Sequence, residues 1–124
     1  MEITVEDLQR RFAEYNRLYF GGRLETPRIV VGRWSCGIYG SFRCDKDGRP
    51  LISIRGTKAL GWTDDKLRRV LVHEMIHQLM ENWGLLMRID SAAHLIVWQS
   101  IRIWMNLRWG LHIHTWGEKD RSPK

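Results

Sequence analysis

The stretch TDDKLRRVLVHEMIHQLMENWG, residues 63–84, decides the fold of this 124-residue chain. Thr63 followed by two aspartates is typical of a helix start, because a hydroxyl caps free N–H groups and carboxylates favour the positive end of the helix dipole. Gly84 is the expected stop, so a helix is predicted over residues 63–83. Two histidines and a glutamate stand among apolar residues in the middle of this helix.

His73, Glu74 and His77 form the pattern H-E-x-x-H within this helix. Residues four apart lie on one helix face, so both imidazoles can bind one ion at about 2.0–2.1 Å from each nitrogen. Glu74 is displaced around the helix, where it falls short of the ion but can take a proton from a water on it. The spacing predicts one zinc ion per chain with Glu74 as the base. The alternative, two hydrogen-bonded histidines without a metal, would bury unliganded imidazoles and a carboxylate at a high cost.

A catalytic zinc site has three protein ligands and one open position, so a third ligand is expected. His94 is the first candidate, because it lies in the first turn of the next predicted helix and a short turn over 84–90 would fold it back. Asp90 is the second candidate. Glu81 lies about 12 Å along the helix axis from His73, too far to share an ion with it.

Helical and strand patterns continue on both sides of this stretch. Apolar residues recur every three or four positions over 5–19, with Thr4 as the expected cap and Gly21-Gly22 as the expected end. Asp47-Gly48 is a turn signal that predicts an antiparallel hairpin. The predicted strands, rich in β-branched and aromatic residues, are 29–31, 38–42 and 51–54.

A further helix is predicted from about residue 90 to residue 108, ended by Gly110. Residues 111–116 alternate apolar residues with histidine and are predicted to form a short last strand. The expected architecture is one α+β domain over 1–116 with a three-stranded antiparallel sheet, followed by a polar tail over 117–124. His112 and His114 would then share one strand face, where they could bind a metal or stabilise an oxyanion, although ordinary strand histidines are more common.

The composition fits one soluble globular domain, with 44% hydrophobic and 27% charged residues. Each of the seven tryptophans is expected to pack in the core. Cys36 and Cys44 lack the paired spacing of a zinc ribbon and are predicted to be core thiols. The N-terminus has no apolar signal segment and no run of eighteen apolar residues occurs, which favours a cytoplasmic protein without a membrane partner.

Positive charge is concentrated in residues 21–60, which hold eight of the basic residues and three of the acidic ones, in a chain of net charge +6. If this region is a sheet, one of its faces or edges is expected to be basic. Such a surface favours a polyanion as a partner, and DNA is the candidate. A solvated surface that happens to be rich in arginine is the alternative.

Three segments together resemble the SprT-like zinc metallopeptidase family: YFGGRL at 19–24, VLVHEMIH at 70–77, and His94 followed at the fourth position by Trp98. The resemblance covers nearly the whole chain and lacks the C-terminal zinc ribbon of some members. It implies a zincin-like fold, zinc ligands His73, His77 and His94, and Glu74 as the catalytic residue. Leu95 stands where the family usually has glycine.

The leading hypothesis is a monomeric zinc endopeptidase that cleaves extended or unfolded protein segments, including proteins associated with DNA. Its substrate is expected to lie along the sheet edge formed by residues 51–55. Tyr39 is a candidate transition-state donor. One alternative is a basic DNA-binding module with a structural zinc, for which Glu74 would have no use. Another is a metal-dependent hydrolase of small molecules, which would require a closed pocket.

Overall fold

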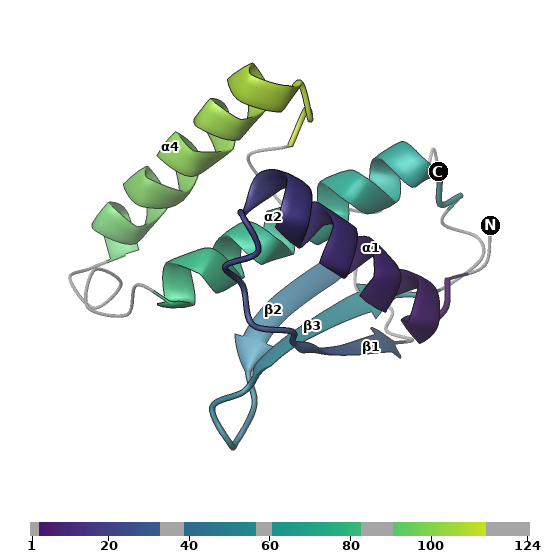
Figure 1. Cartoon of the computed structure of the whole chain (residues 1–124). Helices are drawn as coiled ribbons and strands as arrows, with labels where there is room; N and C mark the ends of the chain where they lie inside the picture. Colours follow the sequence, from purple (N-terminus) through teal and green to yellow (C-terminus); the bar gives the residue numbers. More distant parts are fainter. Residues whose placement is uncertain (1–2, 33–38, 57–60, 83–90, 114–124) are drawn as a thin grey trace, which may run out of the picture.

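The computed structural model describes residues 3–32, 39–56, 61–82 and 91–113 (Figure 1). The described elements follow the chain in the order α1 (Val5–Tyr19), β1 (Arg28–Gly32), β2 (Gly40–Cys44), β3 (Pro50–Arg55), α2 (Asp64–Asn82) and α4 (Ser91–Trp109). The predicted α+β class is confirmed, and the helices lie where their caps and periodicity placed them.

The three strands form a mixed sheet in the order β1-β3-β2. β2 and β3 are antiparallel, as predicted, but β1 runs parallel to β3, with Ile29 opposite Ile52. The prediction of an all-antiparallel sheet is therefore wrong for β1. The predicted substrate edge at residues 51–55 is also wrong, because β3 is the central strand and both of its edges are already hydrogen-bonded.

The turn between β2 and β3 is built by Asp45 and Gly48. The Gly48 N–H donates to the Asp45 carbonyl at 2.9 Å, and the Asp45 N–H donates to the Arg49 carbonyl at 2.8 Å. Gly48 has a φ of 79°, which residues with a Cβ rarely adopt. This is a three-residue hairpin loop with a left-handed glycine, and the turn predicted from Asp47-Gly48 is confirmed.

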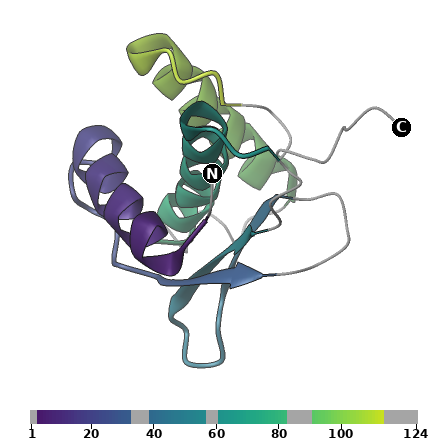
Figure 2. The same ribbon diagram turned by 90° about the vertical axis from the view of Figure 1, so that its right-hand side faces the viewer.

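The helices are stacked on one side of the sheet (Figures 1 and 2). α1 packs against β1, and α2 packs against β2 and β3. α4 contacts α2 and lies farther from the strands, as the turned view in Figure 2 makes clear. Alternate residues of the strands face the helices, and their buried members include Ile29, Ile52 and Ile54. α2 is thus the central element, enclosed by the sheet and by both other helices.

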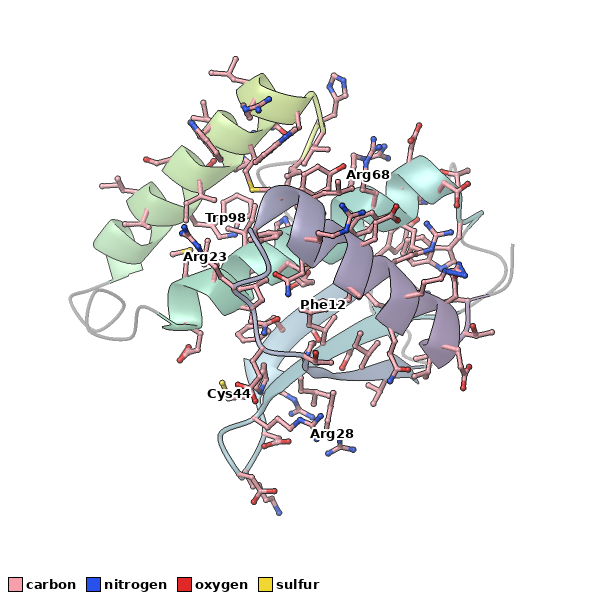
Figure 3. The ribbon with its side chains drawn as sticks, in the orientation of Figure 1. Phe12, Arg23, Arg28, Cys44, Arg68 and Trp98 are labelled. Atoms are coloured by element: carbon pink, nitrogen blue, oxygen red, sulfur yellow. The ribbon has the colours of Figure 1, made fainter. Side chains whose placement is uncertain are left out.

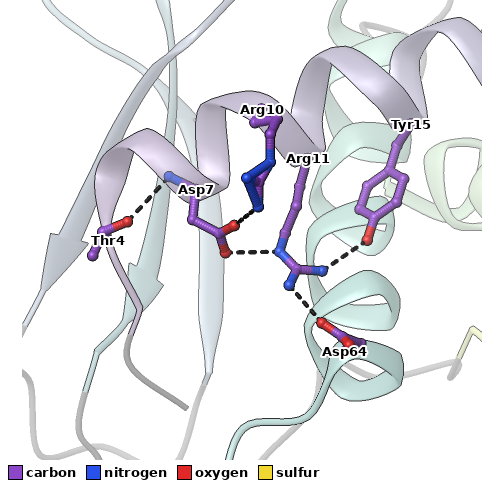
Figure 4. A network of polar contacts seen from close by, with 6 residues as sticks. All are labelled: Thr4, Asp7, Arg10, Arg11, Tyr15 and Asp64. Carbon is purple, nitrogen blue, oxygen red and sulfur yellow. Dashed lines mark hydrogen bonds and ion pairs between the residues drawn. The ribbon is translucent and has the colours of Figure 1, made fainter.

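Polar contacts fix the N-terminal ends of α1 and α2 to each other (Figure 4). Thr4 accepts the Asp7 N–H at 3.1 Å and caps α1 as predicted. The Arg11 guanidinium donates to Asp7 at 2.8 Å and to Asp64, in the first turn of α2, at 2.5 Å. A third Arg11 bond reaches the Tyr15 hydroxyl at 3.4 Å. The Arg11 guanidinium thus joins α1 to α2 through Asp64, a residue 53 positions later in the sequence.

The chain after α4 does not form the predicted strand over residues 111–113. Gly110, with a φ of 64°, ends the helix as expected, but His112 also has a positive φ of 60°, which is incompatible with extended backbone. Instead, the Asn106 side chain accepts the Ile113 N–H at 2.8 Å and donates to its carbonyl at 3.1 Å. The apolar alternation reflects burial of Leu111 and Ile113 against the helices, not sheet pairing.

Burial of the tryptophans is uneven. Trp62 and Trp98 are buried, as predicted, whereas Trp104 is 57% exposed, so the core prediction is wrong for it. Trp109 is partly buried against the core. Trp34, Trp83 and Trp116 lie outside the described residues. Among the described helices, none combines the length and the apolar character needed to cross a membrane.

Candidate metal centre

The candidate site lies on α2, which is buried on most of its circumference. Thr63 begins this helix: its hydroxyl accepts the Lys66 N–H at 3.1 Å and its carbonyl accepts the Leu67 N–H at 2.9 Å. The helix then runs through the centre of the fold. Its fully or almost fully buried apolar residues are Leu67, Val70, Leu71, Val72, Met75, Ile76 and Met80. A helix that is enclosed in this way holds its polar side chains in fixed positions.

His73, Glu74 and His77 form a compact group whose potential ligand atoms all lie within 4.8 Å of one another. His73 and Glu74 are buried, and His77 is half-buried. The two imidazole centroids are 5.0 Å apart. This group could hold a metal ion, so the structure brings together the residues that the H-E-x-x-H spacing singled out.

The Glu74 carboxyl lies in an unusual environment for an acid. Only 4% of the residue is exposed, and burial raises the pKa of its carboxyl from the ordinary value to about 8. Desolvation penalises the charged form, so a cation on the neighbouring imidazoles would favour ionisation again. A buried acid beside two potential metal ligands is the kind of environment expected for a base that works next to a cation.

Trp98, labelled in Figure 3, lies on α4 and packs on both imidazoles. Its ring centroid lies 4.6 Å from that of His73 and 5.4 Å from that of His77, and its plane is within 24° of the His77 plane. The Trp98 indole Nε1 is buried and has no hydrogen-bond partner among the described residues. The ring restricts the imidazoles from the α4 side and shields the group from solvent. Sequence reasoning noted Trp98 only as part of a family pattern, and this contact gives it a physical role.

A cavity of about 500 Å³ opens beside the group, between α2 and β2. Glu74 and His77 reach it from α2, together with Glu81 from the last turn of that helix. The opposite wall is the end of β2, formed by Phe42, Arg43 and Cys44. Two members of the candidate metal group are therefore accessible from the edge strand of the sheet.

Cys44, at the end of β2, is exposed to solvent (Figure 3). The prediction of a core thiol is therefore wrong for Cys44, and Cys36 lies outside the described residues. Partial burial raises the pKa of the Cys44 thiol, and the neighbouring carboxylates of Glu81, Asp45 and Glu25 raise it further. The thiol is thus protonated and weakly nucleophilic near neutral pH.

Gly40, the first residue of β2, was missed as a site residue in the sequence. A Cβ at this position would lie 2.9 Å from Val70 Cγ1, 3.3 Å from Ile54 Cδ1 and 3.5 Å from Glu74 Cγ. Only glycine lets α2 approach β2 this closely, and the approach sets the position of Glu74. A glycine inside a predicted strand was the available signal, since it often marks such a contact.

The two candidates for a third ligand lie at the beginning of α4 and just before it. His94 lies in the first turn of α4, but its side chain and all of Asp90 are outside the description. The His94 position precedes Trp98 by one helical turn, on the same face of α4. The assignment of His94 stays a prediction, and α4 is the element that reaches the two imidazoles.

The other candidate side chains are not part of the group. The buried Tyr39 hydroxyl accepts a bond from Lys66 Nζ at 3.0 Å, and Tyr39 does not line the cavity. His112 is exposed on the turn after α4, and His114 lies outside the described residues. The predicted pairing of His112 and His114 on one strand face is wrong, because residues 111–113 form no strand.

The donor set is compatible with zinc. Imidazole nitrogens at about 2.0–2.1 Å from a tetrahedral ion lie roughly 3.3–3.4 Å apart, a separation that small side-chain rotations can give within this group. Imidazole is a good ligand for zinc and for several other divalent transition metals, so the side chains alone do not select the ion. In comparisons with protein-family models, curated proteins and solved structures, no match to the chain was found.

Proposed function

We propose that this protein is a zinc metalloendopeptidase that cleaves extended or unfolded protein segments. The observation that carries the proposal is the placement of His73, Glu74 and His77 together at the wall of a cavity beside an edge strand. A site that only stabilised the fold would need neither a buried carboxyl next to its ligands nor an opening onto the sheet edge.

We assign His73 and His77 as two zinc ligands and His94 as the third. When bound, zinc supplies a Lewis acid that polarises a peptide carbonyl and makes water a stronger nucleophile at neutral pH. Glu74 accepts a proton from the attacking water and returns it to the amine that leaves when the peptide bond breaks. Trp98 keeps both imidazoles in place and excludes solvent from the α4 side. Gly40 sets how far the Glu74 carboxyl stands from β2.

The substrate strand is expected on β2 and not on β3. β2 is hydrogen-bonded to β3 on one side and is last in the sheet order, so its other edge can pair with a further extended segment. The end of β2 forms one wall of the cavity, and Glu74 and His77 belong to the facing wall. A peptide added to this edge would pass the catalytic carboxyl in an extended conformation, which excludes folded segments from cleavage.

DNA is the proposed second partner, on the sheet face that turns away from the helices. Arg28 and Arg43 lie opposite each other across Leu51 of β3, and Lys46 and Arg49 are exposed on the adjoining hairpin. Asp45 lies 3.8 Å from Arg28 and partly offsets the charge. Four phosphate contacts imply a slope of roughly −4 for the logarithm of the binding constant against the logarithm of salt concentration. Absence of DNA binding at low salt in an anisotropy titration would remove this partner.

Cleavage of an unfolded protein tests the main proposal. Wild-type protein loaded with zinc should degrade reduced, carboxymethylated casein, and a chelator should abolish the activity. Glu74→Gln should retain zinc and fold while losing about 10² to 10⁴ in rate, because an amide cannot accept the proton. Arg10→Gln on α1, at a side chain that is 71% exposed, serves as a surface control with wild-type activity. Zinc binding without cleavage of any unfolded protein, with or without DNA, would favour a DNA-binding module with a structural zinc.

A further inference from the structure

α4 exposes large apolar side chains on the face that does not contact the imidazoles. Ile96, Ile103, Trp104 and Leu107 are 66%, 48%, 57% and 83% exposed, which is unusual for large apolar side chains. At 100° per residue, these positions fall on one stripe along about three turns of the helix. Trp98 and Met105 occupy the opposite face and are buried. The helix therefore has one apolar face toward the core and another toward solvent.

The exposed stripe continues into a cavity of about 470 Å³ between α4, the end of α1 and Leu79 of α2. Ile101, Trp104 and Met105 line the cavity from α4, and Tyr19 and Phe20 line it from α1. The Trp104 ring packs edge-on against Trp109 at 5.2 Å, and Trp109 in turn lies 5.2 Å from Tyr19. Stripe and cavity thus form one apolar groove with an aromatic wall, which we call the α4 groove.

The charged side chains of α4 and of the described cavity lining are all arginines. α4 contains no Asp or Glu, and its charged residues are Arg102 and Arg108. Arg23 lines the cavity from the segment that follows α1 (Figure 3). Its Nε lies 3.7 Å from where a Cβ of Gly21 would be, so its stem folds back over that glycine. Among the described residues, the Arg23 guanidinium has no acidic partner within ion-pair distance, in contrast to Arg11.

We infer that the α4 groove is a docking site for an amphipathic helix that presents bulky apolar side chains on one face and carboxylates beside them. The apolar side chains of the stripe have the spacing needed to pack against a second helix. Trp and Arg are among the residue types that most often anchor interfaces. The Arg23 guanidinium, which has no acidic partner among the described residues, supplies the preference for acid. The inference rests on the α4 groove alone and holds whether or not the metal centre is a peptidase.

Charge also argues against the other occupants. Two copies of this chain meeting through α4 would bring arginines together around an apolar seam to which α4 contributes no carboxylate. The last residues, 114–124, contain one bulky apolar residue, Trp116, and three basic against two acidic residues, so they do not match the groove in sequence. A concave cavity fits a protruding side chain better than a flat lipid surface.

The test uses two fluorescein-labelled helical peptides with leucines on one face, one with glutamates and the other with lysines on the remaining positions. Anisotropy titration of the full chain should give a Kd at least about tenfold lower for the glutamate peptide. Leu107→Gln and Arg23→Gln should each weaken that binding by about tenfold or more, whereas Arg10→Gln at the N-terminal end of α1 should not. A chelator should leave the binding unchanged.

Several outcomes would overturn the inference. Equal affinity for the two peptides, or binding that neither groove variant changes, would remove the α4 groove as an acid-selective docking site. Self-association of the free chain that Leu107→Gln abolishes, seen by sedimentation velocity, would assign the groove to a second copy. Binding to phosphatidylglycerol vesicles without binding to the glutamate peptide would assign it to an anionic lipid surface. Unchanged circular dichroism of both variants ensures that a loss of binding reports the groove.

Discussion

The two helices that flank α2, α1 and α4, end in the same way and differ on their outer faces. In each, an asparagine amide near the C-terminus makes two hydrogen bonds to the backbone of the segment that follows. Asn16 binds the N–H and carbonyl of Leu24, and Asn106 binds those of Ile113. The same side chain type serves at both helix ends, because an amide offers a donor and an acceptor and can therefore pair with the N–H and the carbonyl of one residue.

The solvent-facing sides of α1 and α4 differ in composition. α1 buries Leu8, Phe12 and Tyr15 and presents mostly polar residues to solvent, and Arg11 joins it to α2. α4 instead meets α2 through Trp98 on the two histidines and leaves an apolar stripe exposed. α1 therefore exposes a single large apolar side chain, Leu18, whereas α4 combines a place at the candidate metal centre with an exposed apolar stripe.

The largest expected difference in the free energy of unfolding is between substitutions on the two faces of α4. Trp98→Ala removes a buried ring and should lower the free energy of unfolding by about 3–5 kcal/mol. Trp104→Ala removes a ring that is 57% exposed and should change it by less than about 1 kcal/mol. Urea denaturation in the presence of a chelator measures both without a contribution from metal. Equal losses for the two variants would contradict the assignment of one core face and one free face.

Removing the asparagine amide at the end of α1 or α4 should give the next largest loss in the free energy of unfolding. Asn16→Ala leaves two backbone groups of Leu24 without their partner and should cost about 2 kcal/mol. Asn106→Ala should cost about 1 kcal/mol, because Arg102 Nη1 also donates to the Ile113 carbonyl at 3.2 Å. Thermal denaturation of both variants compares the two ends directly. A larger loss for Asn106 than for Asn16 would mean that the segment after α4 is held more firmly than its contacts indicate.

The smallest effect is expected at the N-terminal end of α1. Arg11→Gln removes the link between Asp7 and Asp64 and should cost about 1 kcal/mol at low salt and less at high salt. Arg10→Gln is the matched control, because Arg10 pairs with the same Asp7 from a side chain that is 71% exposed. Its effect should be close to zero. The same loss for both variants would remove Arg11 as a specific link between the helices.

Local signals in the sequence were sufficient for the helices and the hairpin. Thr4, Thr63 and Gly110 are caps whose bonds involve only neighbouring residues, and Gly48 supplies the left-handed turn. The partner of β1 was not predictable in this way. Its apolar residues fit either neighbour, and the choice of β3 depends on how α1 and α2 cover the sheet, which no short segment encodes.

Which site residues could be predicted depends on whether local or long-range contacts bring them together. The group of His73, Glu74 and His77 was predictable because helical spacing alone brings its members together. Gly40 and Cys44 were missed or misplaced because their roles come from the approach of β2 to α2 across more than twenty residues of sequence. The strand expected after α4 was wrong because alternating burial of Leu111 and Ile113 arises in a turn held by Asn106.

The most direct test of the central claim, that α2 and α4 together hold a catalytic zinc, is the metal content of purified variants. Elemental analysis of wild-type protein isolated without added metal should give one zinc per chain. His77→Ala and His94→Ala should each lose most of it, while Asp90→Ala should retain it. Loss of zinc in Asp90→Ala and retention in His94→Ala would transfer the third ligand to Asp90. Absence of any transition metal from the wild type, or full zinc in His77→Ala, would contradict the account.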